Sequence, residues 1–150
     1  RTGALNGGTR TPEVGERLMM TGGCFCGQVR YEALGTPFNA TVCHCSDCRR
    51  VAGSPFVAWF SVAPAEFRFV SGEPKRFASS AKAMRSFCPD CGTPLTFQHN
   101  DFPAEIDITT CSLDNPELVP PQDHVRTNRR LSWLRLADGL KEYPGTRSAG

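Results

Sequence analysis

Seven of the eight cysteines in this chain occur in short clusters whose spacing is typical of metal ligands rather than of disulfides. The densest cluster runs from Cys43 to Arg49 and contains three thiols, with His44 between two of them. If the chain enters this cluster as an extended strand, Cys43 and Cys45 share a face, because strand side chains repeat every two residues. A helix that begins near Cys48 would return its thiol to that face, at the positive end of the helix dipole. Three convergent sulfurs suit one zinc ion and leave a fourth position for water or substrate, as in a catalytic site.

The same spacing also fits a closed structural site in which His44 or a distant residue supplies the fourth ligand. Arg49 and Arg50 follow the cluster directly, where they could offset its charge or hold an anionic substrate; the alternative is two solvated arginines. By residue type, His44, Asp47 and His124 are the candidates for a base that moves a proton, and each could equally have a structural role.

Four further cysteines form two pairs that lie far apart in the sequence, Cys24 with Cys26 and Cys88 with Cys91. The second pair has the pattern Cys-Pro-x-Cys-Gly, which is typical of a zinc knuckle whose backbone N–H groups point at the sulfurs. On an extended segment, the first pair would face the same way. Four thiolates make a closed structural site, which can supply about 10–16 kcal/mol of apparent folding free energy. We therefore expect two zinc ions, a structural ion here and a second ion on the first cluster.

The remaining cysteine, Cys111, lies in a predicted strand without a partner nearby in sequence, and we expect it to be a buried core thiol. No secretion signal is visible, and no apolar run approaches the roughly 20 residues of a membrane span. Reduced thiolates on metal in the cytoplasm are therefore favoured over disulfides in a secreted protein. A net charge of +2 argues against nucleic acid or a membrane surface as the main partner.

A mainly β domain must position these clusters. Short runs rich in Val and Phe alternate with Gly, Pro and Ser turns, and they predict strands at 28–34, 56–62, 66–70, 75–78, 84–87, 94–99 and 104–112. One helical turn is expected at 49–53 and would end at Pro55, whereas the segment 124–143 fits a helix or a strand equally well. We expect residues 1–18 to be a disordered tail or an expression remnant, and residues 19–150 to be one zinc domain.

Several motifs together resemble one known family, the glutathione-dependent formaldehyde-activating enzymes, which also include centromere protein V. The motifs that carry the resemblance are Gly23-Cys24-x-Cys26-Gly27, Cys43-His44-Cys45-x-x-Cys48-Arg49, Phe87-Cys88-x-x-Cys91-Gly92, Ser112-Leu113-Asp114, His124-Val125 and Arg130-Leu131-x-Trp133. The resemblance implies an Mss4-like fold, a folded β-sheet domain organised around a structural four-cysteine zinc site. It also implies that Cys43, Cys45 and Cys48 hold a second, catalytic zinc. The activity named for the family is a carbon–sulfur lyase reaction that joins formaldehyde to glutathione, giving S-hydroxymethylglutathione.

Three functions fit these observations, and we favour the first. It is a zinc-dependent lyase of glutathione or small-thiol/aldehyde adducts, with His44 in the catalytic cluster and Arg49 as a substrate-binding residue. The second is a non-catalytic zinc module that binds protein or chromatin through a basic stretch formed by Arg126, Arg129, Arg130 and Arg135. The third is a redox protein that releases zinc when its thiols are oxidised. A homodimer is left open.

Overall fold

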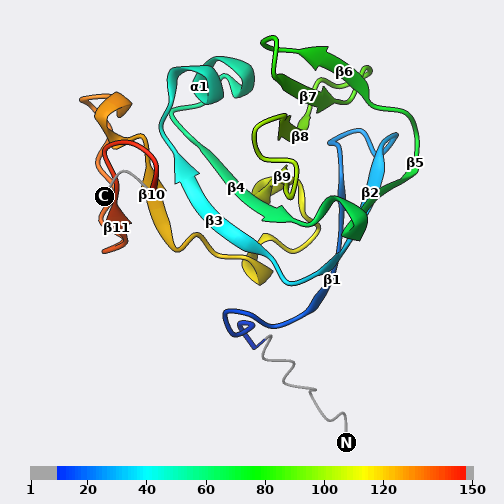
Figure 1. Ribbon diagram of the computed structural model, residues 1–150, viewed down its shortest axis with the longest axis horizontal. Helices are drawn as coiled ribbons and strands as arrows, with labels where there is room; N and C mark the ends of the chain where they lie inside the picture. Colours follow the sequence, from blue (N-terminus) through cyan, green and yellow to red (C-terminus); the bar gives the residue numbers. More distant parts are fainter. Residues whose placement is uncertain (1–9, 148–150) are drawn as a thin grey trace, which may run out of the picture.

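The computed structural model describes residues 10–147, which form two β-sheets and one short α-helix (Figure 1). The mainly β fold expected from the sequence is therefore confirmed. The expected tail lies partly outside the described residues. Within the described part, the first strand already begins at Leu18, and Arg17 forms an ion pair with Glu66.

The smaller sheet has three strands in the order β1-β2-β5, all antiparallel. These strands are β1 (Leu18–Gly23), β2 (Arg30–Gly35) and β5 (Phe67–Ser71). The larger sheet has the order β11-β10-β3-β4-β9-β8-β7-β6. Its strands are β3 (Phe38–Cys43), β4 (Val57–Val62), β6 (Lys75–Ala78), β7 (Ala83–Phe87), β8 (Pro94–His99), β9 (Ile106–Thr109), β10 (Asp123–Val125) and β11 (Lys141–Glu142). Strand β10 is parallel to β3 and to β11, and the other neighbours are antiparallel.

The helix α1 (Ser46–Ala52) follows β3 and is longer than the single turn expected at 49–53. It begins early because the sulfur of Cys45 accepts a hydrogen bond from the backbone N–H of Cys48, a contact that caps the first turn. It ends at Gly53 rather than at Pro55, because Gly53 has a φ of 62° and its N–H bonds back into the helix. Short 3₁₀ turns occur at Pro64–Glu66, Thr110–Ser112, Pro116–Leu118 and Thr127–Arg129.

Each strand expected from the sequence is present, β6 and β8 with the expected ends and the others with shifted ends. Strand β1 was not expected, and β3 was considered only as an extended entry into the cluster at Cys43. Strand β3 lacks a clean alternation because Asn39 has a φ of 51° and the pairing with β4 is irregular there. The strand expected at 104–112 stops at Thr109, and the 3₁₀ turn after it exposes Cys111. The prediction that Cys111 is a buried core thiol was therefore wrong. The undecided 124–143 segment forms β10, a 3₁₀ turn and β11.

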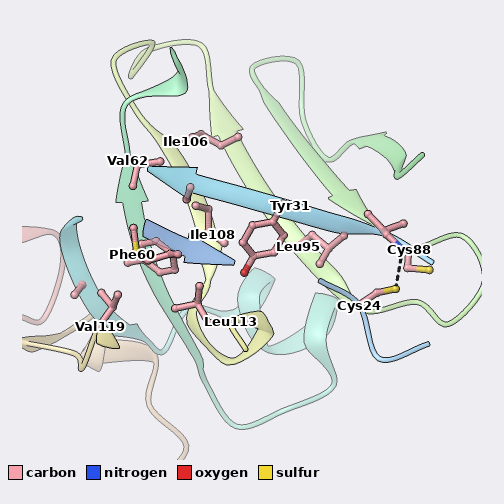
Figure 2. Packing of buried hydrophobic residues seen from close by; sticks show 14 residues of the cluster. Cys24, Tyr31, Phe60, Val62, Cys88, Leu95, Ile106, Ile108, Leu113 and Val119 are labelled. Carbon is pink, nitrogen blue, oxygen red and sulfur yellow. Dashed lines mark hydrogen bonds between the residues drawn. The ribbon is translucent and has the colours of Figure 1, made fainter. Parts of the chain in front are cut away.

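The hydrophobic core lies between the two sheets (Figure 2). Tyr31 of β2 is fully buried among residues of the larger sheet, and its hydroxyl lies 2.7 Å from Oγ of Ser112. Gly22 of β1 allows this close packing, since a Cβ there would come within 2.4 Å of the Tyr31 hydroxyl oxygen. Cys24 and Cys88 lie together at one end of the core, where the two sheets meet.

Candidate functional site

The sulfurs of Cys24, Cys26, Cys88 and Cys91 all lie within 4.8 Å of one another. The first pair comes from the turn between β1 and β2, and the second pair comes from the turn between β7 and β8. The first pair does not lie on an extended segment as expected. A turn brings its sulfurs within 3.6 Å of each other, and within this turn the N–H of Gly27 bonds to the carbonyl of Cys24. This cluster therefore links the smaller sheet to the larger one.

Hydrogen-bond donors surround the four sulfurs, as a set of metal-bound thiolates requires. The N–H of Val29 donates to Sγ of Cys24 at 3.2 Å, and two N–H groups of the second turn reach Sγ of Cys88 at 3.4 and 3.5 Å. The hydroxyl of Thr93 lies 3.2 Å from Sγ of Cys91 and, with its backbone N–H, lowers the pKa of that thiol to about 5. Donors at these positions stabilise the charged form of a thiol, so the residues fit a closed zinc site.

The sulfurs of Cys43, Cys45 and Cys48 form a second group within 4.8 Å of one another. Cys43 is the last residue of β3, Cys45 caps α1, and Cys48 lies in its first turn, buried. This is the strand-then-helix arrangement that the sequence indicated. Hydrogen bonds from the thiols of Cys43 and Cys48, together with N–H groups of the helix start, lower the pKa of Cys45 well below its usual range. A thiolate at the N-terminus of the helix fits a divalent cation.

These three cysteines line a cavity of about 480 Å³, and no fourth ligand joins their sulfurs among residues 10–147. Its other lining residues are Asn39, Thr41, Ser46, Asp47, Trp59, Arg85, Phe97, Asp107, Val125, Arg126, Asn128 and Arg129. Of the residues expected from the sequence, Asp47 lines the cavity, whereas His44 and Arg49 do not. Three sulfurs on the wall of a cavity leave room for a further ligand beside a bound metal ion.

A row of side chains crosses four neighbouring strands along this cavity. The strand register pairs Arg85 with Phe97, Phe97 with Asp107, and Asp107 with Ser61. The guanidinium of Arg85 lies 4.6 Å from the centre of the Phe97 ring, and Oγ of Ser61 donates to the Asp107 carboxylate at 2.5 Å. Burial raises the pKa of Asp107 to about 6, although the Ser61 hydrogen bond opposes the shift. A carboxyl group in this range can both accept and return a proton near neutral pH.

The side chain of His44 belongs to a buried hydrogen-bonded chain rather than to the cavity wall. Its Nε2 lies 2.9 Å from Nδ1 of His124, and Nε2 of His124 lies 2.7 Å from the Asp138 carboxylate; both rings are fully buried. Burial lowers the pKa of His44 to about 4, so this imidazole is neutral. We assign the protons from the network: His124 donates to Asp138, and His44 donates to His124. The chain fixes the residue between Cys43 and Cys45, which is a positioning role.

Arg49 is a half-buried residue of α1, and its Nε has no hydrogen-bond partner among the described residues. The basic stretch expected at 126–135 is split: Arg126 and Arg129 line the cavity, whereas Arg130 bonds to Glu142 at 2.6 Å and Arg135 to the carbonyl of Ser132.

Sequence reasoning missed Arg85 and Asp107, which line the same cavity as the expected cysteine motif. A signal existed, since each is a single charged residue inside a short strand of otherwise uncharged residues. Charged side chains are seldom buried without a reason.

None of the helices within residues 10–147 is long and apolar enough to cross a membrane.

Comparisons with known proteins find a matching family, similar sequences and a similar fold. Residues 19–129 match the sequence profile of a family described as glutathione-dependent formaldehyde-activating enzyme. A putative glutathione-dependent formaldehyde-activating enzyme of Halomonas elongata is 25% identical over 130 residues, covering 79% of this chain and 82% of that protein. An uncharacterised lyase of Schizosaccharomyces pombe is 34% identical over 80 residues, which are 53% of this chain and 58% of that protein.

A solved structure of a Rhodobacter sphaeroides protein superposes with a TM-score of 0.55 at 21% identity, covering 83% of this chain and 99% of that one. At this identity, the likeness supports the fold alone.

Proposed function

Because the chain belongs to the glutathione-dependent formaldehyde-activating enzyme family, we propose that it is a zinc-dependent, lyase-like enzyme of adducts between a small thiol, such as glutathione, and an aldehyde. In one direction, the thiol sulfur bonds to the carbonyl carbon and the thiol proton ends on the carbonyl oxygen. With formaldehyde the product is an S-hydroxymethyl thiol. The reverse reaction breaks the same carbon–sulfur bond and returns the proton to sulfur, so that no further co-reactant is needed.

The observation that carries this proposal is the group of three cysteine sulfurs on the wall of a cavity of about 480 Å³. Three thiolate ligands with room for another ligand are the donor set of a catalytic zinc site, whereas the four-cysteine cluster has the donor set of a closed one. A zinc ion held by Cys43, Cys45 and Cys48 would supply a Lewis acid and a binding position for a thiolate sulfur.

The residues around the cavity supply the remaining requirements of the reaction. Asp107 is the side chain that we assign to proton transfer, since its pKa of about 6 lets it carry the thiol proton to or from the carbonyl oxygen. Trp59 and Phe97 give the cavity apolar walls that limit the access of water. The hydrogen-bonded pair of His44 and His124 holds the backbone between two of the cysteines in place.

The test combines metal content with the rate of adduct exchange. Zinc per chain is measured by elemental analysis in the wild type, in Cys45→Ser, and in Cys111→Ser as a control, because Cys111 belongs to neither cluster. The exchange of formaldehyde with glutathione is then followed by NMR with each protein. We expect the wild type and the control to bind two zinc ions and to accelerate the exchange, and Cys45→Ser to keep one zinc ion, its fold and no acceleration.

A wild type with one zinc ion that Cys45→Ser retains would contradict the proposal. The group of three cysteines would then be a thiol site, and a redox or binding role would replace catalysis by zinc. An unchanged acceleration in Cys45→Ser would contradict it as well.

A further inference from the structure

Arg85 is a buried arginine that forms no ion pair with any other residue of the described chain. It lies in β7 on the wall of the three-cysteine cavity, and only 8% of its surface is exposed. Its Nε and Nη1 atoms are buried and have no hydrogen-bond partner within the described part of the chain. A guanidinium is charged at every physiological pH, so both atoms are unsatisfied donors of a buried cation. Such a group is costly unless a ligand completes it.

No carboxylate within residues 10–147 pairs directly with Arg85. Within residues 10–147 it forms no ion pair, and its cationic contact is with the ring of Phe97. Asp107 lies two strands away in the register and bonds to Ser61. The charge of Arg85 acts to lower the pKa of this carboxyl group across that gap, but no ion pair or hydrogen bond joins the two side chains. Arg85 also borders a neighbouring cavity of about 290 Å³, which none of the acidic residues between 10 and 147 lines.

We propose that Arg85 is the carboxylate-binding subsite of the three-cysteine cavity, so that the cavity selects small thiols that carry a carboxylate group. This inference rests on the proposed function for the position of the sulfur. The guanidinium presents N–H groups in one plane and can bind a carboxylate through two parallel hydrogen bonds. Stacking on Phe97 leaves that plane available and fixes its direction.

The sheet topology sets the length of the ligand. Strand β7 is four strands from β3, which ends at Cys43. At about 4.8 Å per strand, the backbones would be about 19 Å apart in a flat sheet, and the twist of the sheet and the arginine side chain both shorten this gap. On this estimate, we expect a three-carbon thiol to be too short to reach from the sulfurs to the guanidinium. We therefore expect a ligand of the length of a short peptide.

The test measures the dissociation constants of matched probes by calorimetry on the zinc-loaded protein. The carboxylate probes are 3-mercaptopropionate and 6-mercaptohexanoate, and the neutral probes are the corresponding mercapto-alcohols. We expect the longer carboxylate to bind the wild type about 10- to 100-fold more tightly than its alcohol, as one charge-assisted contact provides, and the shorter pair to differ less.

Three variants test whether Arg85 causes the preference for the carboxylate probe. Arg85→Met should bind the longer acid and alcohol within about 2-fold of each other, since the subsite is gone while the alcohol keeps its affinity. Arg85→Lys should retain part of the preference, because a lysine keeps the charge but loses the two parallel bonds. Arg126→Met, which removes an exposed arginine of the same cavity, should keep the full preference. The ratio compares two probes on one protein, so a partly folded preparation does not distort it.

A preference for the acid that persists in Arg85→Met, or that disappears in Arg126→Met, would overturn the proposal. The S-methyl thioethers of the same probes separate it from the proposed function. A thiol that binds no better than its thioether would contradict zinc binding at the three cysteines, and a carboxylate preference that remained would still support the Arg85 subsite.

Discussion

The substitution Asp107→Asn tests whether the cavity holds a desolvated carboxylate. Burial raises the pKa of Asp107 from its usual value of 3.8 to about 6, so the folded protein binds this proton more tightly than the unfolded chain. The resulting stabilisation is complete below pH 3.8 and is lost as the pH rises through 6. Above that pH, the ionised carboxylate lowers the free energy of unfolding by a constant amount. Asparagine has the same shape, can accept the Ser61 hydrogen bond and carries no charge, so it removes this cost.

The size of the effect follows from the two pKa values. A difference of about two pKa units lowers the free energy of unfolding by about 3 kcal/mol once Asp107 is ionised in both the folded and the unfolded state. At pH 5, where Asp107 is ionised mainly in the unfolded state, the loss is about 1.5 kcal/mol. Asp107→Asn should therefore exceed the wild type in stability by up to these amounts. Urea unfolding of the zinc-saturated proteins at several values between pH 5 and 8 measures the difference directly.

Ser61→Ala provides the companion measurement. The serine hydroxyl lowers the pKa of Asp107, so its removal should move the loss of stability to higher pH. If Asp107→Asn is less stable than the wild type at pH 8, or if the difference does not grow between pH 5 and 8, the carboxylate is not desolvated. An ion pair with Arg85 would be the simplest reason, and it would also contradict the anion subsite.

Three further predictions concern the fold and the support of the three-cysteine group. Cys88→Ser should lose the structural zinc and fail to fold, because about 10–16 kcal/mol of metal-linked free energy exceeds the usual stability of a domain; zinc content and circular dichroism check this. Tyr31→Phe should cost about 1 kcal/mol in urea unfolding, because Ser112 keeps its bond to the Thr109 carbonyl and is not left unpaired. Asp138→Ala leaves Nε2 of the buried His124 without a partner and should cost about 1–3 kcal/mol, with faster zinc loss to a chelator; unchanged values for both would refute the positioning role.

The sequence was most informative where one local rule decides the structure. The cysteine spacing identified both clusters because metal ligands must converge, and it predicted the passage from strand to helix around Cys43–Cys48. The turn around Cys88 was also predictable, because its motif ends in a glycine. Gly92 has a φ of 79°, a conformation that residues with a side chain rarely adopt. Short apolar runs between turn residues predicted β4 almost to its ends, and β6 and β8 to their ends.

The rest depends on contacts between distant segments, and local patterns do not contain them. Strand β1 includes two glycines, which normally indicate a turn, and it pairs because Gly22 lets Tyr31 pack against the backbone. The position of His44 between two cysteines suggested a role in the metal site, but its side chain contacts His124, which is far away in the sequence. Arg85 and Asp107 become neighbours of the cysteines only through the register of the larger sheet.

The two cysteine clusters differ in what they connect, and this difference bears on their roles. The four-cysteine cluster joins the turn that follows β1 to the turn that follows β7, so a metal ion bound there would hold the two sheets together. The other three cysteines are close together in the sequence, from the end of β3 to the first turn of α1. The buried pair of His44 and His124 fixes the residue between two of them. A metal ion there closes no long loop, so its removal costs the chain little entropy or packing. A site that the fold does not need is free to exchange ligands, and catalysis requires that freedom.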